Sequence, residues 1–215
     1  MGFCRTRNAT AIRVAVLHLY LPLKSKEQMT QLEMLAGLWR DGVIRYILVA
    51  GGWSDGMSYN VASKPVFAPK YLRDCLVELG VPAHCIFAAP QSFIKHWTLN
   101  VVSTWGEVKQ MLRLLRGLMD MTGTGQAELV FVGMPTHMQR AIWLWRCYNW
   151  LMTALGRGVH MKIDNPVPLG IEPDPEWLKG EWSRNLIAYI DCFGVWIAWA
   201  IHMLRRWQAR KACPR

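Results

Sequence analysis

The sequence predicts an α/β fold in which an open, mainly parallel sheet is flanked by helices. A strand–helix–strand unit is complete by Gly52, and such units imply parallel strands. From Ala127 to Arg146 an apolar run ends at Gly133 and Pro135, and a helical pattern follows. Such a junction lies at the carboxyl end of a strand, where ligands of open α/β sheets usually bind.

Size and composition suit a folded domain that interacts with anions. The chain has 215 residues, of which 52% are hydrophobic, enough for a sizeable core. Its formal net charge of +10 favours anionic partners. Lysines and arginines are scattered among the helices instead of forming one stripe, so nucleic-acid binding is not expected. Six cysteines without a C-x-x-C pair indicate reduced, cytosolic thiols.

The first element is an apolar run at Val14–Leu21, which fits either the core of a signal peptide or a buried strand. No small-residue cleavage site follows it. Instead, Ser25–Gln28 has the pattern of a capping box, and the helix that it opens places Leu32, Leu35 and Trp39 on one face together with Gln28. We therefore favour the strand.

The second strand, at Tyr46–Ala50, leads into a glycine-rich loop. Gly51 and Gly52 allow the backbone to approach a ligand closely, and Ser54 and Asp55 can hydrogen-bond it. This loop is not a G-x-G-x-x-G fingerprint, and such a turn is as often only a turn.

The middle of the chain is predicted to form mainly helices and strands of the core. A helix is expected over residues 69–79, a short strand over 85–89, and a helix with one apolar stripe over 101–119. Thr98 and Asn100 lie between the last two elements. They are candidate ligand-binding residues, although Thr98 is equally suited to cap the helix that follows.

The candidate place for chemistry is the start of the helix after Pro135. The first backbone N–H groups of the helix lie there, together with the side chains of Thr136, His137 and Arg140. His137 is a candidate general acid or base, and Arg140 can bind a carboxylate or phosphate with two hydrogen bonds. Asp55 is a candidate either to orient the histidine or to bind a ribose hydroxyl. The plainer alternative is that His137 caps a turn and Arg140 pairs with a carboxylate. No P-loop, G-x-S-x-G, H-E-x-x-H or paired metal carboxylates occur, so no metal site is expected.

Three motifs in register resemble the SanA/ElyC/YdcF family. Thr136–Ala141 is similar to its "S/T-x-H-x-x-R-A" element, Tyr46–Gly52 to its second strand with a double glycine, and Tyr71–Pro82 to its helix and "L-x-x-x-G-V-P" turn. The resemblance covers residues 11–170. It implies a three-layer Rossmann-like domain over residues 1–170, a link to bacterial envelope maintenance, and S-adenosylmethionine as a candidate ligand.

The chain departs from that family at two acidic positions. Relatives usually carry a glutamate near Ala68–Pro69, and the segment around Trp97 and Leu99 matches the family's "S-x-N-T-x-E-N" only loosely. The departures favour a non-catalytic role, whereas His137 and Arg140 favour a retained ligand site. The sequence therefore does not decide whether the protein is an enzyme.

Residues 171–215 are expected to form a proline-rich connection and an apolar C-terminal helix with a basic tail. Leu186–Leu204 holds only Asp191 and His202 as ionisable groups, which fits a membrane span. Both residues lie on one narrow, polar stripe, so we favour a helix that packs on the sheet or lies at a membrane surface. The expected location is cytoplasmic, with membrane association through this helix as the open question.

Two functional hypotheses follow. In the first, the protein binds an anionic small molecule at the carboxyl ends of the strands; a nucleotide, S-adenosylmethionine and a phosphorylated envelope intermediate are the candidates. In the second, it is a non-catalytic, envelope-associated factor that docks on the inner membrane surface.

Overall fold

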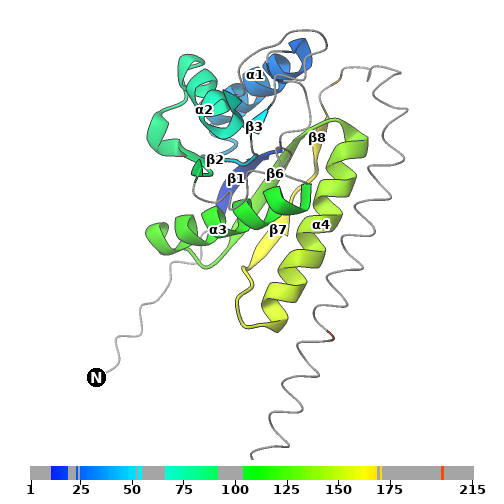
Figure 1. The fold of residues 1–215 in the computed structure, drawn as a ribbon. Coiled ribbons are helices and arrows are strands. Elements are labelled where there is room, and N and C mark those ends of the chain that lie inside the picture. The colour runs from blue at the N-terminus through cyan, green and yellow to red at the C-terminus, as the bar shows by residue number, and fades with distance from the viewer. Residues whose placement is uncertain are drawn as a thin grey trace, which may run out of the picture.

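The computed structural model describes residues 11–18, 23, 25–51, 53–54, 66–91, 104–168, 170 and 200 (Figure 1). Short strands alternate with longer helices along the chain. The elements are β1 (Ile12–Leu17), α1 (Lys26–Arg40), β2 (Tyr46–Val49), β3 (Trp53–Ser54), β4 (Val66–Phe67), α2 (Ala68–Glu78), the 3-10 turn η1 (Ala83–Cys85), β5 (Ile86–Ala88), α3 (Thr104–Thr122), β6 (Ala127–Gly133), α4 (Pro135–Ala154), β7 (Met161–Ile163) and β8 (Val167–Pro168).

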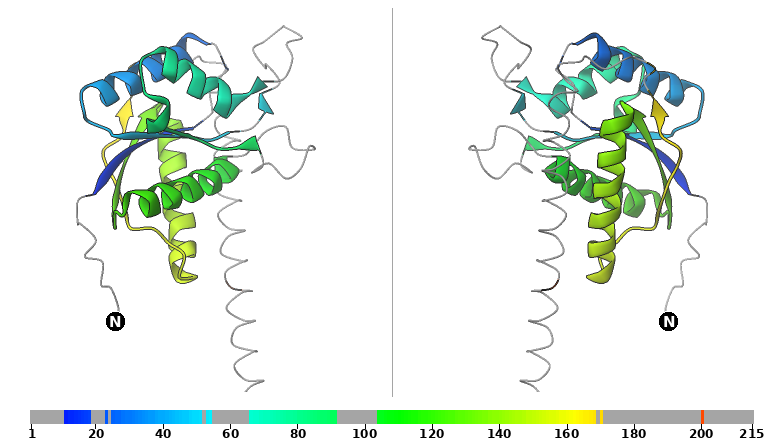
Figure 2. Two further views of the ribbon diagram at one scale, coloured as in Figure 1. Left: turned by 90° about the vertical axis from the view of Figure 1, so that its left-hand side faces the viewer. Right: turned by 90° about the vertical axis from the view of Figure 1, so that its right-hand side faces the viewer.

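The main sheet confirms the predicted α/β architecture. Its strands are ordered β5-β2-β1-β6-β7, β8 also pairs with β6, and every pairing is parallel. Helices α1 and α2 cover one face, and α3 and α4 cover the other (Figure 2). Three layers result, with the Rossmann-like arrangement of a doubly wound sheet. The order of the strands reverses between β1 and β6, which makes the carboxyl ends of these two strands the topological switch point.

The sheet interior explains why its strands are apolar runs. Helices cover both faces, so strands β1, β2 and β6 have no exposed position and need no alternation of polar side chains. The first apolar run is confirmed as a strand, β1, which pairs with both β2 and β6 in the middle of the sheet. It ends at Leu17, earlier than the predicted Leu21, and His18 follows at its carboxyl end.

Helix α1 begins as predicted, but only half of the expected capping box is present. The Ser25 hydroxyl oxygen accepts a hydrogen bond from the Gln28 backbone N–H at 3.1 Å. The reciprocal bond, from the Ser25 backbone to the Gln28 side chain, does not form. Gln28 is fully buried, and its amide instead donates to Gln31 Oε1 at 3.0 Å. The prediction of a complete capping box was wrong because the Gln28 side chain is buried in the core and does not turn back to the Ser25 backbone.

The second half of the domain differs from the prediction at its turns. Helix α3 runs to Thr122, three residues beyond the predicted end at residue 119, and the Thr122 hydroxyl donates to the Leu118 carbonyl at 2.8 Å. The proline-rich stretch after β7 contains the short strand β8, which pairs with Val132 and Gly133 of β6. The sheet therefore continues to residue 168, within the predicted domain of residues 1–170.

An ion-pair ladder crosses the neighbouring strands β1, β6 and β7. Arg13 of β1 contacts Glu128 of β6 at 3.4 Å and Asp164, just after β7, at 2.5 Å. Lys162 of β7 contacts the same Glu128 at 3.7 Å. The backbone N–H of Asn165 and the side chain of Arg13 both hydrogen-bond Asp164 and hold its pKa below the ordinary value. Such partly exposed pairs add little stability each but favour one register.

The predicted C-terminal helix, Leu186–Leu204, lies outside the described residues except for Ala200, as does the rest of residues 171–215. Within the described ranges, no helix combines the length and the apolar character needed to cross a membrane.

Candidate functional site

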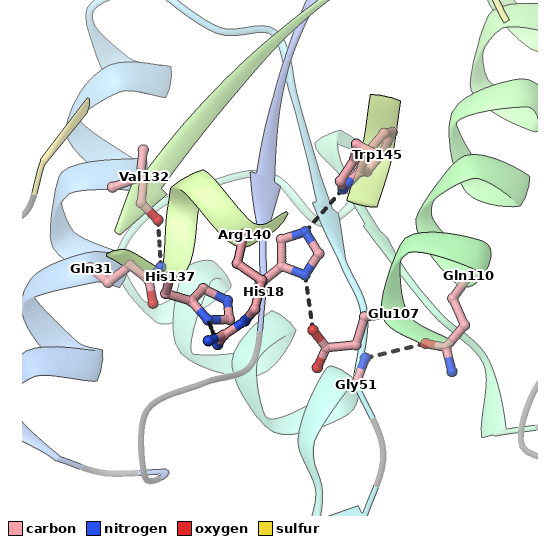
Figure 3. Close-up of polar contacts among 9 residues, drawn as sticks. All are labelled: His18, Gln31, Gly51, Glu107, Gln110, Val132, His137, Arg140 and Trp145. Atoms are coloured by element: carbon pink, nitrogen blue, oxygen red, sulfur yellow. Dashed lines mark hydrogen bonds and ion pairs between the residues drawn. The ribbon is translucent and has the colours of Figure 1, made fainter. Parts of the chain in front are cut away.

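Buried polar side chains gather at one end of the sheet. Among the described residues, seven polar or charged side chains are buried: His18, Gln28, Gln31, Glu107, Gln110, His137 and Arg140. Their contacts lead to the carboxyl ends of β1, β2 and β6, and Figure 3 shows six of them there. Burying such groups is costly unless they are hydrogen-bonded, so this concentration marks the switch point as the candidate site.

His18 follows β1 directly and is held by two buried partners. Its Nδ1 lies 2.9 Å from Glu107 Oε2 on α3, and its Nε2 lies 3.0 Å from the Trp145 indole nitrogen on α4 (Figure 3). An indole N–H can only donate, so Nε2 of His18 must accept. His18 is therefore neutral, with its proton on Nδ1, and that proton is donated to the Glu107 carboxylate.

Aromatic packing surrounds His18. Its ring is stacked with Phe131 at 6.2 Å between centroids and meets Trp145 edge to face at 6.5 Å. Phe131 and Trp145 also meet edge to face, at 5.9 Å. The apolar rings lower the local dielectric, which strengthens the His18 hydrogen bonds and makes any missing partner expensive.

His137 and Arg140 form a second buried pair in the first turns of α4. Arg140 Nη2 lies 2.6 Å from His137 Nδ1 (Figure 3). A guanidinium has no acceptor, so Arg140 donates and Nδ1 of His137 accepts. The proton of neutral His137 therefore sits on Nε2, and that nitrogen is a donor. The rings of His137 and His18 are 5.9 Å apart, which joins the ends of β6 and β1.

The start of α4 adds positive potential at the same place. Pro135 occupies the beginning of the helix, the N-cap residue Met134 makes no side-chain capping bond, and the first turn contains no acidic residue. The first N–H groups of a helix carry partial positive charge, and the Arg140 guanidinium lies just beyond them. The helix start and Arg140 together favour a negative charge at the end of β6.

Two glutamines tie neighbouring helices to the strand ends. The Gly51 backbone N–H, just after β2, donates to Gln110 Oε1 on α3 at 3.2 Å. Gly51 has a φ of 141°, a conformation that favours glycine. On the other face of the sheet, Gln31 Nε2 on α1 donates to the Val132 carbonyl at the end of β6, at 2.6 Å. Both contacts fix backbone groups at the carboxyl edge.

The structure brings together only some of the residues that the sequence proposed. His137, Arg140 and Gly51 lie in the buried cluster. Ser54 belongs to β3 and Thr136 to α4, but the structure describes their backbone alone. The remaining candidates lie outside the described residues: Gly52, Asp55, Thr98 and Asn100. Within the described ranges, no three His, Cys, Asp or Glu side chains gather as metal ligands.

Sequence reasoning missed His18, Glu107 and Gln110. His18 interrupts an apolar run at a strand end, and Glu107 and Gln110 lie beside the apolar stripe of α3, next to Val108 and Met111. A charge on an apolar helix face is a usable signal because carboxylates are rarely buried without a partner. Glu107 thus places a buried carboxylate at this corner of the sheet.

A comparison with known proteins returns no relative. No family model matches the chain, and neither curated proteins nor solved structures give a significant match. The likeness to the SanA/ElyC/YdcF family therefore stays a prediction, and the chemistry of the site is argued from its geometry.

Proposed function

We propose that the protein binds a small molecule through an anionic group, a phosphate or a carboxylate, at the switch point between β1 and β6. The observation that carries the proposal is the His137–Arg140 pair in the first turns of α4. Its guanidinium, its imidazole N–H and the start of the helix all favour negative charge. The formal net charge of +10 adds long-range attraction for the same ligands.

The hydrogen bonds favour binding over proton abstraction. A general base needs an available lone pair, but His137 Nδ1 accepts from Arg140, and its other nitrogen carries the proton. His18 uses both ring nitrogens, one toward Glu107 and one toward Trp145. We therefore assign His137 and Arg140 to ligand binding. Acid–base catalysis by His137 would first require Arg140 to move away.

The family resemblance narrows the ligands to be tried. It suggests a nucleotide, S-adenosylmethionine or a phosphorylated envelope intermediate, each of which carries a phosphate or a carboxylate. A hydrogen bond to a charged group contributes roughly 1.5–3 kcal/mol. Loss of the Arg140 charge should therefore weaken binding about 10- to 150-fold.

The test compares Arg140→Gln with Arg146→Gln. Glutamine can still donate to His137 but lacks the charge, and Arg146 is an exposed arginine on the same helix. Each protein is titrated calorimetrically with inorganic phosphate, nucleotides, S-adenosylmethionine and sugar phosphates. We expect the wild type and Arg146→Gln to bind one ligand alike and Arg140→Gln to lose affinity. Equal affinity in all three proteins would contradict the proposal.

The second hypothesis, docking on the inner membrane surface, depends on Leu186–Leu204, which lies outside the described residues apart from Ala200. Co-sedimentation of the same variants with anionic vesicles separates it from the first. Vesicle binding that is unchanged in Arg140→Gln, without any small-molecule binding, would support the membrane factor.

A further inference from the structure

The orientation of a buried glutamine pair on α1 is fixed by the backbone of β6. The Val132 carbonyl can only accept, so the group of Gln31 that faces it is the NH₂. Oxygen Oε1 of Gln31 then points away, and the group of Gln28 that contacts it at 3.0 Å must be an NH₂ as well. The remaining polar atom of this relay is Oε1 of Gln28.

This oxygen is a buried acceptor that none of the described residues satisfies. Gln28 is fully buried, and its Oε1 has no hydrogen-bond partner in the described part of the chain. A buried polar atom without a partner costs about 1–3 kcal/mol, so a retained one calls for an explanation.

The position of Gln28 places this acceptor at the carboxyl edge of the sheet. Helix α1 starts on that edge, because it follows β1, and runs back along the face of the sheet. Gln31 reaches the carbonyl of Val132, at the end of β6. Gln28 is three residues nearer the start of the helix, or about 4.5 Å further toward the edge. It therefore stands at the height of the strand ends, where the start of α4 favours the anion.

We propose that Gln28 Oε1 accepts a hydrogen bond from a hydroxyl group of the ligand. This inference rests on the proposed function and narrows its substrate class to compounds that join an anionic group to a neutral hydroxyl, of which sugar phosphates are the simplest. A neutral donor suits the site because an amide oxygen carries no charge to offset that of a buried ammonium. In this arrangement Arg140 and His137 bind the anionic group, and Gln28 gives specificity for a hydroxyl group elsewhere on the same ligand.

The test uses Gln28→Met with three probes: inorganic phosphate, ribose 5-phosphate and ribose. Methionine keeps the length of the side chain but lacks the acceptor. Gln139→Met, which alters an exposed glutamine at the start of α4, is the matched control. Both variants are first checked by thermal unfolding. Gln28→Met exchanges one unpartnered oxygen, on Gln28, for another, on Gln31, so we expect it to fold.

We expect the wild type and Gln139→Met to bind ribose 5-phosphate at least tenfold more tightly than phosphate, and Gln28→Met to lose that preference while its affinity for phosphate is unchanged. An equal preference in Gln28→Met would overturn the role of Gln28 but leave the anion site intact. If ribose binds in a manner that depends on Gln28 while phosphate does not bind, the anion proposal fails and the hydroxyl site stands. Absence of binding by all three probes would overturn both.

Discussion

Replacement of Trp145 by phenylalanine tests the buried hydrogen-bond chain at the switch point. The indole N–H of Trp145 donates to His18 Nε2 at 3.0 Å, and Trp145 is 0% exposed. Phenylalanine fills most of the space but cannot donate. His18 Nε2 would then be a buried acceptor without its partner, which costs about 1–3 kcal/mol. The smaller ring adds about 1 kcal/mol of lost apolar burial.

The expected loss is therefore about 2–4 kcal/mol in the free energy of unfolding, measured by urea titration with the slope compared between proteins. For a chain of this size, this corresponds to a fall in Tm of roughly 4–16 °C. Trp150→Phe is the matched control because Trp150 lies on the same helix and is 43% exposed. Its cost should stay within about 0.5 kcal/mol.

A second measurement reads the proton positions on His18 directly. Nitrogen NMR of the wild-type ring should show the proton on Nδ1, as the donors and acceptors around His18 require. A proton found on Nε2, or a Trp145→Phe variant no less stable than Trp150→Phe, would refute the tautomer assigned to His18 and with it the argument that both of its ring nitrogens are engaged.

Two further predictions concern stability. Gly51→Ala should lower the free energy of unfolding by about 1–3 kcal/mol in denaturant titrations, because Gly51 has a φ of 141°. The control is Gly37→Ala, in the middle of α1 with nothing near the added methyl group, which should raise the free energy of unfolding by about 0.5–1 kcal/mol. A similar loss of stability in both variants would contradict the role of the Gly51 backbone conformation. Hydrogen bonds from the Asn165 backbone and Arg13 lower the pKa of Asp164 below 3.8, so its contribution to stability is present above that pH and is lost as the pH falls through the folded-state pKa. Asp164→Asn should therefore be less stable than the wild type at neutral pH, with a difference that shrinks below pH 3.8 in acid unfolding curves; a difference independent of pH would exclude this linkage.

Most elements of the domain could be predicted because their signals are local. Apolar runs identified β1, β2 and β6, and the Ser25 cap marked the start of α1. The two-residue strands β3, β4 and β8 were not foreseen, since so few residues establish no periodicity. The order of the strands could not be foreseen either, because hydrophobic periodicity specifies a buried face but not the neighbouring element.

The candidate site was only half visible in the sequence for the same reason. His137 and Arg140 are three residues apart at a strand–helix junction, so a short motif contains both. His18 and Glu107 are 89 residues apart, and only the packing of α3 against the sheet brings them together. Gln28 was identified from the sequence, but the capping role predicted for its side chain was wrong. Its backbone N–H donates to the Ser25 hydroxyl, which caps the helix, while its side chain turns inward, and that direction depends on tertiary structure.

The pairing of β8 with β6 decides where the chain leaves the sheet. Pro168 pairs with Gly133, and β8 runs parallel to β6, so the polypeptide departs from the same edge at which α4 begins. A force applied to the chain beyond residue 170 would act first on the end of β6 and on the first turns of α4, which contain His137 and Arg140. A ligand at the proposed site and a force applied through the chain after β8 would therefore act on the same end of β6. A fluorescent label at Gly170 would accordingly sense the candidate site, whereas one near Gly156, at the opposite end of α4, would serve as the insensitive reference.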